Sequence, residues 1–144
     1  MSIINKLHNI FRIDVSAAKS SMNEINELIQ YSSITIPNEF IEIIKEKTEI
    51  EISVNNKKYI RIWGAQGCLE MNRIYNIQKY IPDSLAIGDD ECDNVVLYAY
   101  GKEGFGVYMV AFNNLDVNDL THISSSLETF FIEGEGVDIF NSVW

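Results

Sequence analysis

The residues with the clearest chemical potential in this sequence are four carboxylates that fall within five positions, namely Asp89, Asp90, Glu91 and Asp93. Clustered carboxylate oxygens are the ligands that Ca²⁺ prefers, so their spacing can be compared with a calcium loop. Asp89, Glu91 and Asp93 supply its first three oxygen positions. Asn94 stands where the loop needs glycine, however, and Tyr100 where it needs a bidentate glutamate. The sequence therefore predicts no metal site and no cofactor.

Two other interpretations of the same carboxylates stay open. The first is a solvated polar turn. The second is a partner surface, because grouped carboxylates imitate the charge array of a phosphate backbone and could occupy the cationic cleft of an enzyme that acts on nucleic acid. Electrostatic steering would make that association fast and sensitive to salt.

Three aromatic residues, Trp63, Tyr75 and Tyr98, are expected in the core, since large aromatic side chains bury most of their area. Any of them exposed beside the acidic run would be a candidate hot spot of an interface. The predicted partner-binding residues are Asp89, Asp90, Glu91, Asp93, Trp63 and Tyr75.

The search for catalytic residues identifies none. His8 and His122 lack a companion at metal-binding spacing, and His122 is expected on a helix surface. The serines at 124–126 have neither a neighbouring base nor a GxSxG elbow. Cys68 and Cys92 form no CxxC pair and are expected to be small buried residues.

The glycines within residues 101–106 separate two predicted strands, so they indicate a hairpin turn and not a phosphate loop, which needs a following helix. An enzyme with a paired-carboxylate mechanism is the remaining catalytic alternative. It is disfavoured because no two acids are predictably placed across a cleft. We therefore expect a protein that is not an enzyme.

Composition and charge narrow the class of partner. The 144 residues are 47% hydrophobic, which is enough for one domain with one core. A net charge of −10 disfavours nucleic acid and favours a basic protein partner. Because the bases lie mostly between Lys45 and Lys79 and none follows Lys102, one side of the fold could be mixed in charge and another strongly acidic.

The cysteine usage fits a reducing cytoplasm, and no apolar run approaches the ~20 residues of a membrane span. A cytoplasmic protein without membrane attachment is expected.

The periodicity of apolar residues predicts both helices and strands. Helices are expected over residues 3–11, from Ser21, over residues 37–47, in one or two pieces over residues 68–80, and over residues 118–132. Ser21 and Glu24 have capping-box spacing, and Gly134 is a plausible terminator of the last helix. The helical faces expected in the core comprise Met22, Ile25, Leu28, Ile29, Leu69, Ile74, Ile77, Tyr80, Leu120, Ile123, Leu127, Phe130 and Phe131.

Two antiparallel hairpins are predicted between these helices. The first joins residues 50–54 and 59–63 through the turn residues Asn55 and Asn56. The second joins residues 95–100 and 107–112, and its apolar first strand is expected in the middle of a sheet. The expected fold class is α+β, one domain over residues 1–144 with a central, mainly antiparallel sheet flanked by helices. Its core spans about residues 20–133, with an N-terminal helix in 1–14 and an aperiodic tail over 134–144.

The order of these elements resembles the SUKH superfamily, which includes fungal cell-wall assembly regulators and many bacterial toxin-immunity proteins. The resemblance covers about residues 22–131. It rests on Ile36-Pro37 followed by Phe40, on the Asn72 and Tyr75 pair, and on the phrase YIRIWGAQGCLEMNRIYNIQKYIPDSLAIGDD over residues 59–90. Family members often have a glycine-rich turn after the isoleucine–glycine pair that is Ile87-Gly88 in this sequence. Residues 90–94 here are instead Asp-Glu-Cys-Asp-Asn.

The resemblance implies a protein-binding module without known enzymatic activity. The expected function is that of a cytoplasmic immunity protein that binds and neutralises a cognate toxin, a basic protein acting on nucleic acid. The alternative is a regulatory scaffold related to cell-wall or glucan synthesis.

Overall fold

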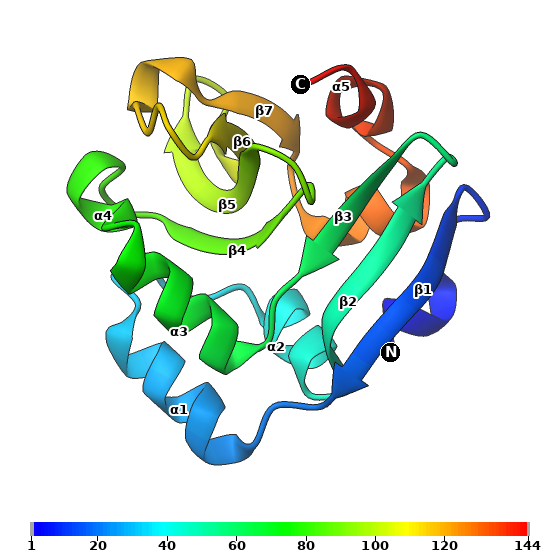
Figure 1. The fold of residues 1–144 in the computed structure, drawn as a ribbon, viewed down its shortest axis with the longest axis horizontal. Helices are drawn as coiled ribbons and strands as arrows, with labels where there is room; N and C mark the ends of the chain where they lie inside the picture. Colours follow the sequence, from blue (N-terminus) through cyan, green and yellow to red (C-terminus); the bar gives the residue numbers. More distant parts are fainter. Residues whose placement is uncertain (1, 144) are drawn as a thin grey trace.

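A computed structural model describes residues 2–143, which fold around one seven-stranded sheet (Figure 1). Every neighbouring pair of strands is antiparallel, and the spatial order follows the chain. The predicted α+β class with an antiparallel sheet is confirmed. The strands are β1 (Phe11–Ala18), β2 (Lys47–Val54), β3 (Lys58–Ile62), β4 (Leu85–Asp89), β5 (Asn94–Gly101), β6 (Gly104–Ala111) and β7 (Thr121–Ser124).

The helices are short and lie around this sheet. In Figure 1, α1 and α3 run side by side at one flank, and α2 lies beside the start of β2. The capping box of Ser21 and Glu24 is present at the start of α1, as predicted. The helical elements are η1 (Ile4–Lys6), α1 (Met22–Tyr31), α2 (Asn38–Ile44), α3 (Ala65–Ile74), α4 (Ile77–Tyr80), η2 (Val117–Asp119), the π-helix η3 (Thr129–Glu133) and α5 (Val137–Ser142).

The sheet turns between β3 and β4, so that β1–β3 and β4–β7 form two halves (Figure 1). Only Arg61 and Ile62 of β3 pair with β4, opposite Asp89 and Gly88, whereas β5 and β6 pair along their full length. We call this short pairing the joint. It requires glycine at position 88, because a Cβ atom there would lie 2.1 Å from the carbonyl oxygen of Arg61.

Both predicted hairpins are confirmed, as is the central position of the second one. Asn55 and Asn56 take positive φ in the first turn, a conformation that asparagine tolerates. Residues 94–99 of β5 are buried, as expected for a strand covered on both faces. Tyr100 at its end is the exception, with 60% of its surface exposed.

Two predicted helices are wrong. Of residues 3–11, only Ile4–Lys6 are helical, and β1 begins at Phe11, within the 1–14 segment that was predicted as a helix. Of residues 118–132, Thr121–Ser124 form β7, so His122 lies on a strand and not on a helix surface. In both places the apolar spacing fits a helix, but hydrogen bonding to a free edge of the sheet overrides this local preference.

Several helix boundaries and buried positions in the structure also differ from the predicted ones. The third helix ends at Ile44, and Lys47 already belongs to β2. The tail predicted as aperiodic contains α5, while Gly134 ends η3 with φ of 78°, as predicted. Ile25, Leu28, Leu69, Ile77, Ile123, Leu127, Phe130 and Phe131 are buried as expected. Met22, Ile29, Ile74 and Tyr80 are exposed instead, and Leu120 is half-buried.

The joint provides a first prediction. Gly88→Ala should lower the free energy of unfolding by about 3 kcal/mol, because the added methyl group forces β3 and β4 apart. Gly104→Ala is the matched control, since φ is +82° there but no atom lies within 4 Å of the added carbon. Strain alone should cost the control about 1 kcal/mol. Urea unfolding of both variants measures the difference, and equal losses would show that the joint is not tightly packed.

Candidate functional site

Asp89 lies inside the joint and connects the two halves of the sheet. It is only 7% exposed. Its Oδ2 accepts a hydrogen bond from Nε1 of Trp63 (2.8 Å) and lies 3.4 Å from Nε of Arg61. Its Oδ1 accepts the backbone N–H of Glu91 at 2.7 Å. A buried carboxylate needs such partners to offset the loss of hydration.

Asp90 is buried as well, on the side of the C-terminal segment. Its Oδ2 accepts from Nζ of Lys58 (2.9 Å) and Nδ2 of Asn94 (2.8 Å), and its Oδ1 accepts from the N–H groups of Cys92 (3.0 Å) and Asn94 (3.1 Å). Burial raises the pKa of Asp90, but the hydrogen bonds from Asn94 and Lys58 together outweigh burial and hold the pKa below its usual value.

The ammonium group of Lys58 extends this network to the end of the chain. It donates to the carbonyl oxygens of Phe140 (3.1 Å) and Val143 (2.7 Å), and it lies 4.7 Å from the centre of the Phe140 ring. The side chain is 7% exposed. Asp90 and Lys58 therefore position both the β4–β5 loop and the segment that carries α5.

The exposed part of the acidic run is Glu91, Cys92 and Asp93, which we call the acidic tip. The N–H groups of Glu91 and Cys92 are held by the buried aspartates, so the tip is rigidly anchored. Glu91 adopts φ of 57°, a left-handed conformation that is costly for glutamate. Burial raises the pKa of Glu91, as do the hydrogen bond with Glu51 and the negative charge of that residue.

The acidic run is thus divided between the interior and the surface. A fully solvated turn is wrong for Asp89 and Asp90, which are buried, and the expected burial of Cys92 is wrong because Cys92 is exposed. Cys68 is buried, as expected. In the part of the chain that the structure describes, no group of three His, Cys, Asp or Glu side chains could hold a metal ion.

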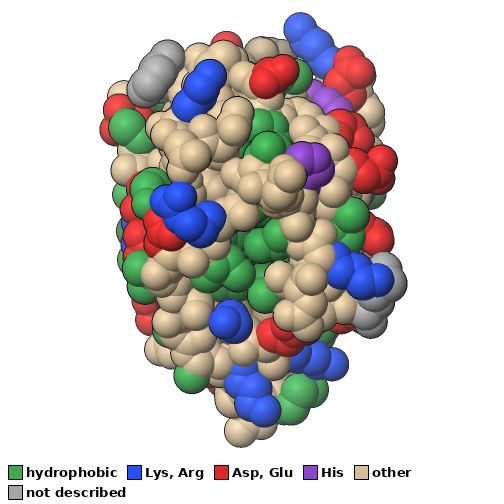
Figure 2. All heavy atoms as spheres, turned by 90° about the vertical axis from the view of Figure 1, so that its right-hand side faces the viewer, with side chains coloured by type: hydrophobic (Ala, Val, Ile, Leu, Met, Phe, Trp, Pro, Cys, Tyr) green, Lys and Arg blue, Asp and Glu red, His purple; other side chains and the backbone are tan. Residues whose placement is uncertain are grey.

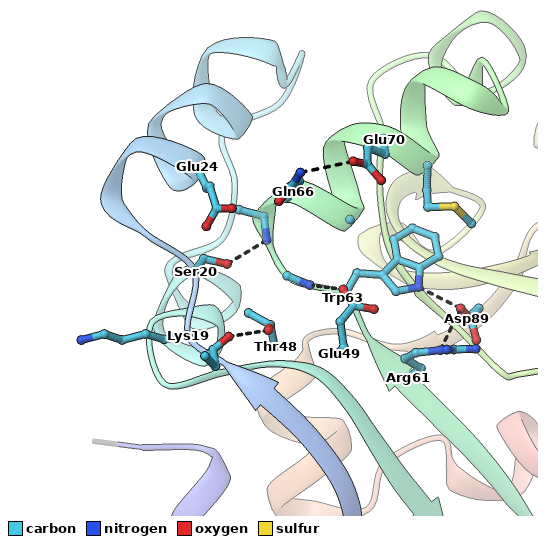
Figure 3. A pocket seen from close by; sticks show the side chains of 15 residues that line it. Lys19, Ser20, Glu24, Thr48, Glu49, Arg61, Trp63, Gln66, Glu70 and Asp89 are labelled. Carbon is cyan, nitrogen blue, oxygen red and sulfur yellow. Dashed lines mark hydrogen bonds and ion pairs between the residues drawn. The ribbon is translucent and has the colours of Figure 1, made fainter.

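A recess of about 610 Å³ opens beside the joint, between the start of α1, the start of α3 and the end of β1 (Figure 3). The charged side chains that line it are Lys19, Glu24, Glu49, Arg61, Glu70 and Asp89.

The carboxylates of this recess serve the fold. Glu24 accepts the N–H of Ser21 at 2.8 Å, and Glu49 accepts that of Gly64 at 2.9 Å, where α3 begins. Glu70 accepts from Nε2 of Gln66 at 3.4 Å, and Asp89 holds Trp63. Carboxylates engaged in this way cap helices and orient side chains, which favours a structural role over acid–base catalysis.

The predicted aromatic residues have different environments. Trp63 and Tyr98 are buried, at 3% and 1% exposed, and confirm the expectation of core residues. Tyr75 is 37% exposed and does not. Trp63, Asp89 and Glu91 lie together at the joint, whereas Asp90 faces Lys58 and Tyr75 belongs to the end of α3.

Sequence reasoning missed Lys58, Arg61, Asn94 and Glu51, which contact the acidic run. For two of them, Glu51 and Arg61, the sequence contained a signal. A hairpin closed around Asn55 and Asn56 places Glu51 directly opposite Arg61, as the register shows. Cross-strand pairs of opposite charge stabilise such sheets. For Lys58 no local pattern exists, because its role depends on how the two halves meet, whereas Asn94 bonds to Asp90 within the same loop.

The face that includes the edge of β1 carries both signs of charge. Figure 2 shows basic and acidic side chains interspersed there, around a hollow in which hydrophobic side chains are visible. This face is therefore mixed in charge. None of the helices within residues 2–143 is long and apolar enough to cross a membrane.

Comparison with known proteins gives one family match. The family model of the SMI1 / KNR4 family (SUKH-1) matches residues 19–133, nearly the range over which the sequence resembles that superfamily. No curated protein matches the chain.

The buried ion pair provides a second prediction. Asp90→Asn should lower the free energy of unfolding by about 3–5 kcal/mol, because it removes one charge of the buried ion pair between Oδ2 of Asp90 and Nζ of Lys58. Asp93→Asn is the matched control, since Asp93 is exposed on the same loop. It should stay within about 0.5 kcal/mol of the wild type. Similar losses in both variants, measured by urea unfolding, would contradict the structural role of Asp90.

The same pair determines a pH dependence. Because the pKa of Asp90 is lowered from 3.8 in the folded protein, the unfolded chain takes up the proton first as pH falls. Its contribution to stability is therefore complete well above pH 3.8 and is lost as pH falls through the lower folded pKa. The free energy of unfolding of the wild type, measured between pH 2 and 6, should fall as pH decreases. That of Asp90→Asn should fall less, because the variant lacks the carboxyl group that takes up the proton.

Glu91 provides a fourth prediction. Glu91→Asn should raise the free energy of unfolding by about 1 kcal/mol, because asparagine tolerates the left-handed conformation and the repulsion from Glu51 disappears. Thermal unfolding measures the change, with Asp93→Asn again as the control. A decrease in melting temperature would show that Glu91 stabilises the loop instead of straining it.

Proposed function

We propose that this chain, which belongs to the SMI1 / KNR4 family (SUKH-1), is an immunity protein that binds a basic toxin and blocks it stoichiometrically without chemistry of its own. The observation that carries the proposal is the anchored acidic tip. Its backbone is fixed by two buried aspartates, while the side chains of Glu91 and Asp93 are directed to solvent. A loop already ordered before binding loses little conformational entropy when a partner docks.

The electrostatics support the same proposal. A protein with a net charge of −10 attracts a basic partner from a distance and raises its association rate. Toxins that cut or modify nucleic acid need a cationic cleft for the phosphate backbone, and an acidic protein can occupy that cleft. We therefore propose a nucleic-acid-acting toxin as the target and the cytoplasm as the compartment.

The energetics of Glu91 also support a binding role. The chain keeps a charged residue in a left-handed conformation and beside another carboxyl group, although asparagine or glycine would relieve the strain. Residues that lower stability in this way are common at binding surfaces, where function needs them. A cationic group of the toxin would relieve the repulsion between Glu51 and Glu91.

The test takes as its candidate toxin any basic protein encoded by a gene adjacent to the one for this chain. Co-expression of the chain should restore growth of cells that produce the toxin, and the purified chain should abolish toxin activity at an equimolar ratio. Glu91→Gln/Asp93→Asn should slow association about tenfold at low salt, as loss of interface charges does, with a smaller effect at high salt.

Glu128→Gln/Glu133→Gln is the control, since it removes two exposed charges away from the tip. Equal effects of both double variants would mean that only the net charge matters. Failure of the wild type to protect cells or to bind the toxin would overturn the immunity function and favour the regulatory scaffold.

A further inference from the structure

A small group of exposed apolar side chains lies at the end of α3. Ile74 is 69% exposed and Tyr75 is 37% exposed. The ring of Tyr75 packs against that of Phe112, which is half-buried, with 4.6 Å between the ring centres. We call Ile74, Tyr75 and Phe112 the anchor patch. Burying it against a partner would remove apolar surface from water, which favours binding.

The anchor patch is physically joined to the acidic tip. The backbone N–H of Phe112 donates to the carbonyl oxygen of Asp93 at 2.8 Å, so the residue that supports Tyr75 is bonded to the tip itself. The N–H of Tyr75 bonds to the carbonyl oxygen of Met71 at 3.1 Å at the end of α3. Both parts are therefore held in one fixed arrangement, an aromatic group beside carboxylates.

The charges around the anchor patch are negative on the side of the tip. Glu91 and Asp93 are exposed there, and Glu70 is exposed one helical turn before Ile74. The neighbouring base, Arg73, is directed to the ring of Tyr31 on α1, 5.4 Å from its centre. The carboxylates of this surface therefore favour a partner that is positive on the side facing the tip.

This charge pattern determines which kind of partner can bind at the anchor patch. A second copy of the chain would bring another net charge of −10, and nucleic acid and anionic lipid surfaces are repelled for the same reason. A basic protein is attracted. Aromatic residues such as Tyr75 carry a large share of binding energy when they are packed in a partner's pocket and surrounded by a polar rim.

We infer that the anchor patch and the acidic tip form one docking surface for a basic protein, which covers Tyr75 and Phe112 with apolar side chains and places Lys or Arg side chains against Glu91 and Asp93. The inference rests on the proposed function, since the toxin is the expected partner. It adds the aromatic anchor and assigns the contact to the exposed members of the acidic run.

The experiment places the photo-crosslinking residue p-benzoylphenylalanine at position 75 in the full chain, expressed in the organism that encodes it. The matched control carries the same residue at position 100, because Tyr100 is also an exposed aromatic but lies at the opposite end of β5. Crosslinked proteins are identified by mass spectrometry, purified, and titrated against the uncrosslinked chain by calorimetry.

Position 75 should crosslink to one basic protein that position 100 does not capture, and the purified pair should bind at 1:1. Tyr75→Ala should weaken this binding at least about tenfold, the effect of truncating an aromatic hot spot. Ile74→Ser, a change at a mostly exposed position, should weaken it about threefold. Tyr100→Ala should stay within about twofold, and thermal unfolding of each variant verifies that it folds.

Four results would overturn the inference. They are no crosslink at position 75, equal crosslinking from both positions, a partner that is acidic or a second copy of the chain, and unchanged affinity of both Tyr75→Ala and Ile74→Ser. The two proposals fail separately. Toxin neutralisation that is insensitive to these variants removes the docking surface alone, whereas capture at position 75 of a basic protein that is not a toxin removes the immunity function alone.

Discussion

The contacts of two buried aspartates, Asp89 in the joint and Asp90 next to it, are the interaction on which the rest of the structure depends. Two residue pairs between β3 and β4 are a weak connection for a seven-stranded sheet. Asp89 reinforces it through Trp63 and Arg61, and Asp90 through Lys58. Each carboxylate loses hydration on burial, and the hydrogen bonds to N–H and ammonium groups offset that loss. The halves of the sheet are therefore held by directional contacts, which specify one arrangement.

The same aspartates also explain why the tip between them and β5 is rigid. Their remaining lone pairs accept the N–H groups of Glu91, Cys92 and Asn94, so the loop has little freedom although its outer side chains are exposed. Stability and recognition thus share one set of residues. The inner carboxylates stabilise the joint, and the outer ones are presented at fixed positions from which a partner can be bound at low entropic cost.

The parts of this fold that the sequence predicts are those with a local physical cause. The capping box at Ser21, the asparagine turn and the β5–β6 hairpin depend on neighbouring residues only. The strands β1 and β7 were missed because they form the two edges of the sheet and gain their hydrogen bonds from distant segments. Burial of Asp89 and Asp90 was missed for a related reason. A run of acids suggests solvent exposure, and the basic side chains that pair with the buried aspartates, Lys58 and Arg61, reach them only in the folded chain.

Residues 90–94 differ from the glycine-rich turn of similar sequences, and the structure shows a physical consequence of this difference at position 91. A glycine at position 91 would satisfy the left-handed conformation without strain, and it would carry no charge. The chain has glutamate there, next to Glu51, and both the strain and the repulsion reduce stability. A fold whose joint is secured by buried ion pairs and hydrogen bonds can tolerate this loss in one loop. The loop of this chain can therefore carry the charge of Glu91 without disturbing the sheet beneath it.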